Sequence, residues 1–144
     1  MSVRAATLED LTALEALMAA VEAHEPQLGE RLLAQATLAL VAPAPGGGAL
    51  GAALVDERAG LGRVRVLVAP DARGRGAGRT LLATAIAEAR TQGWHKLHGE
   101  CEVGDHAALR LAAGAGFEVE AVLVAHRRRP DGTLADLLAL GKVL

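Results

Sequence analysis

The sequence predicts a mixed α/β fold in which one sheet carries helices on its faces. Short apolar runs of strand type alternate with longer segments whose apolar residues follow the helical period. One strand-like run, residues 61–70, leads directly into a glycine-rich turn and then into another helical segment. At 144 residues and 51% hydrophobic composition, the chain is long enough for a buried core. We therefore predict one domain over residues 1–144.

The first third of the chain predicts a short strand followed by two helices. Residues 2–7 alternate weakly, as in a strand, and Thr7 is suited to cap a helix. Residues 24–27 would end that helix, and a short second helix is expected around 27–35. The apolar stripe of the first helix is predicted to contain Leu8, Leu11, Leu14, Met18 and Val21.

The middle of the chain predicts a hairpin and the strand before the turn. Residues 36–42 and 49–57 flank a proline- and glycine-rich connection, which indicates two antiparallel strands. In the following run, Arg63 and Arg65 alternate with Val64 and Val66. That period of two indicates a strand, which Pro70 would end.

The remaining elements follow the same reasoning. A helix is expected to about Gln92, with Gly93 as its C-cap, and then a strand over residues 94–103. Asp105 is suited to be the N-cap of an alanine-rich helix that ends at Gly114 or Gly116. Residues 117–126 and 133–144 indicate a final hairpin that turns at 127–132.

Composition argues against several classes of protein. Trp94 and Phe117 are the only aromatic residues and the net charge is −2, which disfavours a nucleic-acid-binding surface. Cys101 is the single cysteine, so neither an internal disulfide nor a zinc-type cysteine cluster is expected, and no metal cofactor is predicted. The chain shows no signal-peptide pattern and no apolar run of membrane-spanning length. We expect a cytoplasmic protein with no membrane partner.

Positive charge is concentrated in one short segment. Residues 1–62 carry three basic and eight acidic side chains, whereas residues 63–79 carry five arginines against Asp71 alone. This distribution favours a local anion site over a general polyanion-binding surface.

The segment DARGRGAGRTLL, residues 71–82, contains three arginines and three glycines. A glycine-rich turn that opens a helix presents backbone N–H groups, and these bind phosphate oxygens. The segment has neither the lysine of a Walker loop nor the third glycine of a dinucleotide fingerprint. By itself the pattern fits two interpretations: an anion site, or a solvated glycine turn whose arginines face water.

Two signatures together resemble the GNAT superfamily of acyl-CoA N-acyltransferases. Residues 73–78, RGRGAG, match its Arg/Gln-x-x-Gly-x-Gly/Ala signature, after a strand and before an amphipathic helix. Residues 105–117, DHAALRLAAGAGF, resemble its second signature, with Asp105 in place of asparagine. The resemblance implies a mixed sheet of about six or seven strands with about four helices and two splayed parallel strands. The match at residues 105–117 argues against an unrelated phosphoanion-binding protein.

The resemblance implies that the anion is the pyrophosphate of coenzyme A. Acetyl-CoA would be the acyl donor, with its pantetheine arm between the strand at 61–70 and the strand that begins near Trp94. Asp105 carries a negative charge that the family's asparagine lacks, and this could weaken cofactor binding somewhat. The cofactor-binding residues expected on this basis are Val66, Leu67, Val68, Arg73, Gly74, Arg75, Gly76, Ala77, Gly78, Arg79, Asp105, Ala108 and Leu111.

Direct transfer of an acetyl group to an amine needs a base and an oxyanion donor. The resemblance implies that Glu100 is the base and that the Val68 backbone N–H is the oxyanion donor. Strand alternation places His98, Glu100 and Glu102 on one face, where they could line the acceptor channel or face solvent.

The thiolate leaving group also needs a proton, and the usual tyrosine of the family is replaced by Ala112. The chain contains no tyrosine at all. Water, His98 or His106 could supply the proton, or the thiolate could leave unassisted. Cys101 is expected to face the opposite side from Glu100 and to be buried.

Acceptor-side residues are implied by the resemblance in two loops. These are Glu22, His24 and Glu25 in the first, and Arg127 and Arg128 in the second, although both loops could simply be solvated. Together the observations predict an N-acetyltransferase that acts on a primary amine of a small molecule or protein. The alternative is an acyl-CoA-binding module with little or no catalysis. Many members of the family pair through edge strands, so the resemblance allows a homodimer.

Overall fold

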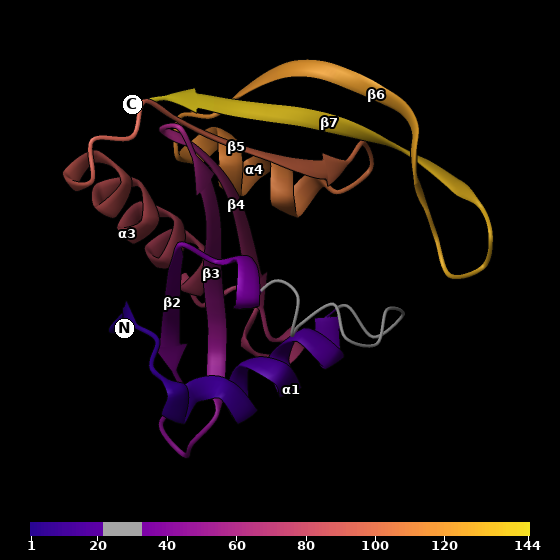
Figure 1. Cartoon of the computed structure of the whole chain (residues 1–144). Coiled ribbons are helices and arrows are strands. Elements are labelled where there is room, and N and C mark those ends of the chain that lie inside the picture. The colour runs from indigo at the N-terminus through magenta and orange to yellow at the C-terminus, as the bar shows by residue number, and fades with distance from the viewer. Residues whose placement is uncertain (22–32) are drawn as a thin grey trace.

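The computed structural model describes residues 1–21 and 33–144. Within these residues the chain forms one seven-stranded sheet with the strand order β1-β2-β3-β4-β5-β7-β6 (Figure 1). The mixed α/β fold predicted from the sequence is confirmed. The strands are β1 Arg4–Ala5, β2 Leu38–Pro43, β3 Ala49–Arg58, β4 Leu61–Val68, β5 Lys96–Glu102, β6 Glu118–Arg128 and β7 Leu134–Val143, and the main helices are α1 Leu11–Val21, α3 Ala77–Thr91 and α4 His106–Gly114.

Neighbouring strands are antiparallel except for the central pair, β4 and β5, which is parallel. A parallel pair needs a crossover connection, and α3 supplies it between β4 and β5. Figure 1 shows the two strands side by side near the C-terminus and then diverging along their length. The expected splayed parallel strands are therefore confirmed.

The two faces of the sheet are covered by different helices because alternate residues of each strand point to opposite sides. On β3, Ala53 and Val55 join a core that contains Leu81 and Ala85 of α3. Their neighbours Ala52 and Leu54 pack instead with residues of α1. The smaller α4 contributes Ala112 to the α3 side.

The N-terminal helix differs in phase from the expected stripe. Thr7 does precede the helical segment, but its first turn, Leu8–Asp10, is a 3-10 turn, and α1 proper begins at Leu11. The tighter turn rotates the side chains that follow. Leu8 is 89% exposed and Leu11 40% exposed, so the expectation that they face the core was wrong. The buried residues of α1 are Leu14, Leu17 and Met18.

The later elements lie close to the predicted bounds. Helix α3 ends at Thr91, and Gly93 follows with a φ of 77°, as expected of a glycine just past a helix end. The hairpin strand β6 continues two residues beyond the predicted end, so that the turn begins after Arg128. Residues 33–35 are helical, and the rest of the predicted 27–35 helix lies outside the described residues. In the part of the chain described, no helix is long and apolar enough to cross a bilayer.

Gly51 offers a direct test of the packing between β3, β4 and α3. A Cβ atom at this position would lie 2.6 Å from the Leu67 carbonyl oxygen and 2.9 Å from Leu81 Cδ1. Since a backbone carbonyl cannot move aside cheaply, Gly51→Ala should lower the free energy of unfolding by about 1–3 kcal/mol. Urea denaturation measures this. Gly46→Ala, in the turn of the same hairpin and with no atom within 4 Å, is the control and should change stability far less.

Candidate active site

The site begins where the β4–β5 ladder ends. The two strands pair only at Leu61–Lys96, Gly62–Leu97 and Arg63–His98. On their outer sides both ladders continue: β3 pairs with β4 as far as Val68, and β7 pairs with β5 as far as Glu102. The sheet therefore stays intact on either side of an opening that widens toward the carboxyl ends of β4 and β5.

The backbone groups on the rim of this opening face into it. Ala69 N–H donates to the Leu50 carbonyl on β3 at 2.8 Å, so alternation directs the main-chain groups of Val66 and Val68 away from β3, toward β5. On the other rim, Val103 N–H donates to the Asp136 carbonyl at 3.1 Å. The same alternation then directs the main-chain groups of Glu100 toward β4. The rim thus carries amides and carbonyls that no neighbouring strand pairs.

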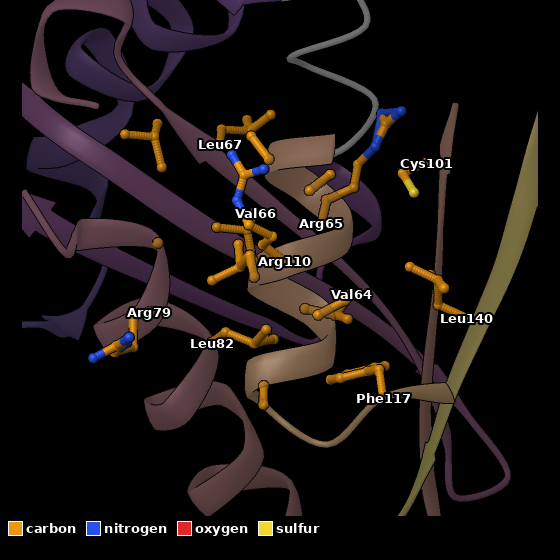
Figure 2. A pocket seen from close by; sticks show the side chains of 18 of the residues that line it. Val64, Arg65, Val66, Leu67, Arg79, Leu82, Cys101, Arg110, Phe117 and Leu140 are labelled. Carbon is orange, nitrogen blue, oxygen red and sulfur yellow. The ribbon is translucent and has the colours of Figure 1, made fainter. Parts of the chain in front are cut away.

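A cavity of about 1150 Å³ occupies the opening and extends to both faces of the sheet. It is lined by Val64 and Val66, which face α4, and also by Arg63 and Arg65, which face the α1 side. Figure 2 shows Val64, Val66, Leu82, Phe117 and Leu140 around its apolar part, with Arg79 on the α3 side. An elongated ligand could therefore reach from one face of the sheet to the other.

At one end of the cavity lies the N-terminus of α3. Gly74 and Gly76 have φ angles of 79° and 85°, which a residue with a Cβ rarely adopts. No backbone or side-chain acceptor among the described residues bonds to the N–H groups of residues 73–79, so they are available for an anion. Gly78 sets the helix close to its neighbours, because a Cβ there would lie 3.2 Å from Leu111 Cδ2 and 3.5 Å from Val68 Cγ2.

Four arginines line the α3 and α4 side of the cavity. Arg73 and Arg79 were predicted from the sequence, whereas Arg90 and Arg110 were not. None of the four forms an ion pair within residues 1–21 and 33–144, so no carboxylate in that part of the chain neutralises their charge. Arg90 follows Arg79 by three helical turns and lies on the same face of α3, a spacing that could have identified it. Arg75 was also predicted to bind the cofactor, but its side chain does not line the cavity.

The start of α4 confirms one prediction about local structure. Asp105 is the N-cap, and its Oδ1 accepts a hydrogen bond from Ala108 N–H at 3.1 Å. Aspartate therefore performs the capping that asparagine would. Asp105, Ala108 and Leu111 all line the cavity, as do the remaining predicted cofactor-binding residues other than Arg75: Val66, Leu67, Val68, Arg73, Gly74, Gly76, Ala77, Gly78 and Arg79.

Glu100 lies on the opposite face of the sheet from α3 and α4, and it lines the cavity. Its Oε2 is 3.4 Å from Arg63 Nη2, and its side chain is 22% exposed. His98 shares this face, but it does not line the cavity, and neither does His106. Burial, followed by the charge of Arg63, lowers the pKa of His98, so that its neutral form is favoured. Cys101 points to the other face and is 7% exposed, and burial raises the pKa of its thiol.

The structure places only some of the predicted acceptor-side residues at the cavity. Arg127 lines the cavity, whereas Arg128 does not. Glu22, His24 and Glu25 lie outside the described residues. Among the residues that the structure describes, no three or more His, Cys, Asp or Glu side chains gather in a group that could hold a metal ion.

The sequence model of the GNAT acetyltransferase family matches residues 21–117, which include both signatures, the opening and Glu100. The chain belongs to this family. A ribosomal-protein-alanine N-acetyltransferase from Brucella melitensis is 31% identical and has a TM-score of 0.86, with 100% of both chains covered. The resemblance seen in the sequence is therefore confirmed.

Two further GNAT structures extend the comparison. A protein from Salmonella typhimurium assigned as an acetyltransferase, solved with its cofactor acetyl-CoA, is 25% identical; the TM-score is 0.86, and the match covers 100% of this chain and 94% of that one. The ribosomal-protein-S18-alanine N-acetyltransferase of Escherichia coli is 20% identical, with a TM-score of 0.85 over 99% and 92% of the chains, and supports the fold alone. No curated protein sequence matches the chain.

The lowered pKa of His98 predicts a pH dependence of stability. Because the folded state resists protonation, the unfolded state binds more protons between the folded-state pKa and the ordinary value of about 6.5. The contribution of neutral His98 to the free energy of unfolding should therefore be fully present above about pH 6.5. It should decrease as the pH falls below that value. Urea unfolding between pH 5 and 8 tests this: His98→Gln should flatten the dependence, and His126→Gln, an exposed histidine on β6, should leave it. An unchanged slope in His98→Gln would contradict the assignment.

Proposed function

We propose that this protein transfers an acetyl group from acetyl-CoA directly to a primary amine. The observation that carries the proposal is the cavity through the opened sheet, with an arginine-rich helix N-terminus at one end and Glu100 at the other. The diphosphate of the donor would bind to the N–H groups of residues 73–79 and to Arg73 and Arg79. Its pantetheine arm would pass between β4 and β5, where the unpaired main-chain groups of Val66 and Val68 can bond to its amides.

In this proposal the thioester lies near the end of β4. The amine attacks the thioester carbon and loses a proton to Glu100, directly or through water. The Val68 N–H, which faces the opening, donates to the oxyanion that develops on the carbonyl oxygen. The carbon–sulfur bond then breaks while the new carbon–nitrogen bond is retained. The products are the N-acetyl amine and coenzyme A.

The thiolate of coenzyme A takes its proton from water in this proposal. Ala112 stands where the family usually has a tyrosine, and it lines the cavity. Neither His98 nor His106 lines the cavity, so both lie poorly for direct proton transfer. The same absence of a phenol favours a second candidate function, a module that binds acyl-CoA with little or no turnover. Release of free thiol from acetyl-CoA in the presence of a mixed amine panel separates the two.

Glu100→Gln tests the catalytic assignment. Loss of a positioned base should lower kcat by about 100-fold or more, while the dissociation constant for acetyl-CoA changes little because the thioester carries no charge beside this carboxylate. Thiol release and calorimetric titration measure the two quantities. Glu118→Gln, an exposed glutamate on β6, is the control. Full activity of Glu100→Gln at neutral pH would show that Glu100 is not the base.

Arg73 and Arg79 test the donor end. Each replacement by alanine should weaken acetyl-CoA binding about tenfold, since each removes a charge-assisted contact with phosphate. The loss should be larger at low salt, where screening is weaker. Arg75→Ala is the comparison within the same loop, and it should have a smaller effect because its side chain does not line the cavity. An equal loss in all three variants would indicate a diffuse charge effect.

A further inference from the structure

At the acceptor end of the cavity, Arg127 lies beside Glu102, a carboxylate that already has a closer arginine partner. Glu102, on the same face of β5 as Glu100, has two guanidinium groups nearby. Arg129 Nε donates to Glu102 Oε1 at 2.9 Å, whereas Arg127 Nη1 lies 3.9 Å from Glu102 Oε2. Arg129 therefore supplies the close contact with this carboxylate. Arg127 lines the cavity, and Arg129 does not.

Arg129 is also held in place from its other side. Its Nη1 donates to Thr133 Oγ1 at 3.2 Å and to the Leu134 carbonyl at 3.5 Å. These contacts tie its guanidinium to the base of the hairpin turn. The Arg127 guanidinium has no hydrogen bond within residues 1–21 and 33–144, and its side chain is 36% exposed. Of the two arginines, Arg127 is the one available to a molecule in the cavity.

A distortion of β6 sets the position of Arg127. The ladder pairs Leu123 with Leu137 and then Arg127 with Ala135, so residues 124–126 lie opposite Asp136 alone. Ala125 in this bulge has a φ of 52°, and its N–H donates to Asp136 Oδ1 at 2.8 Å. In a regular ladder residue 125 would face Ala135, and Arg127 would lie further out toward the turn. Bulges of this kind redirect side chains beside functional sites.

We propose that Arg127 binds a carboxylate of the acceptor, which makes the preferred acceptor an amino acid whose amine is acetylated. The inference rests on the proposed function, because it takes Glu100 as the group that meets the amine. Glu100 and Glu102 are alternate residues of one strand and lie about 7 Å apart along it. Since Arg127 approaches Glu102, the amine and the carboxylate would be separated by the length of a small amino acid. A guanidinium binds a carboxylate through paired, charge-assisted hydrogen bonds.

The test compares amino acids with their carboxamides as acceptors. The probes are glycine, L-alanine, β-alanine and 4-aminobutyrate, each beside the amide of the same compound, with acetyl-CoA as donor. An acid and its amide differ in the basicity of their amine, so the readout is the change in the acid-to-amide ratio of kcat/KM between wild type and variant. Arg127→Gln should lower that ratio about tenfold or more, chiefly through a higher KM for the acids.

Two further variants distinguish a specific effect of Arg127 from the effect of removing any positive charge. Arg58→Gln removes an exposed arginine at the end of β3 and should leave the ratio unchanged. Arg128→Gln removes the neighbouring charge, whose Nη1 lies 3.4 Å from the Gly132 carbonyl, and should also leave it. The proposal is overturned if no acid is acetylated, if Arg127→Gln leaves the ratio as in wild type, or if Arg128→Gln lowers it equally.

Asp136 is a positioning residue in this proposal, and it has its own test. Asp136→Ala removes the acceptor for Ala125 N–H and should lower the acid-to-amide ratio, while Asp136→Asn retains an oxygen there and should restore it. A merely structural role would lower the rates for acids and amides alike. Failure of the proposed function can be told apart from failure of the Arg127 proposal. If the proposed function is wrong, acetyl-CoA will neither bind in calorimetry nor release thiol with any amine, including the amides.

Discussion

The early end of the β4–β5 ladder is the feature on which the rest of the site depends. A sheet that opens in its middle would ordinarily expose main-chain groups at a cost. Here the β3–β4 and β5–β7 ladders continue past the opening and hold each strand in place. The unpaired main-chain groups of Val66, Val68 and Glu100 therefore lie on strands that are paired on their outer sides, and they face the opening.

Charged side chains are arranged differently on the two faces of the sheet. Four arginines line the α3 and α4 side of the cavity, two of them at the N-terminus of α3, and none has an acidic partner in the described part of the chain. On the far face of the sheet each glutamate lies beside an arginine, Glu100 beside Arg63 and Glu102 beside Arg129. An anion is favoured at the N-terminus of α3, and an uncharged reacting group is suited to the passage through the sheet. This division of charge matches a cofactor with a phosphate head and a neutral thioester tail.

The sequence predicted which strands and helices form the site, and on which strand face each residue lies. It predicted less well which side chains reach the cavity. Strand alternation correctly placed His98, Glu100 and Glu102 on one face and Cys101 on the other, because a strand has a strict period of two. The same reasoning could not show that His98 stops short of the cavity. Its position depends on the last β4–β5 pair, Arg63–His98, which joins two residues that are 35 positions apart in the chain.

Local chemistry is what the sequence by itself determined: the glycines that permit positive φ at 74 and 76, the Asp105 cap, and the order of strands and helices. These features depend on neighbouring residues alone. The tertiary structure decided the phase of α1, the inclusion of Arg110, and the choice of Arg127 over Arg128. Each of these depends on packing between distant segments, or on a 3-10 turn or a bulge that shifts residues out of the regular period, and no local pattern specifies such shifts.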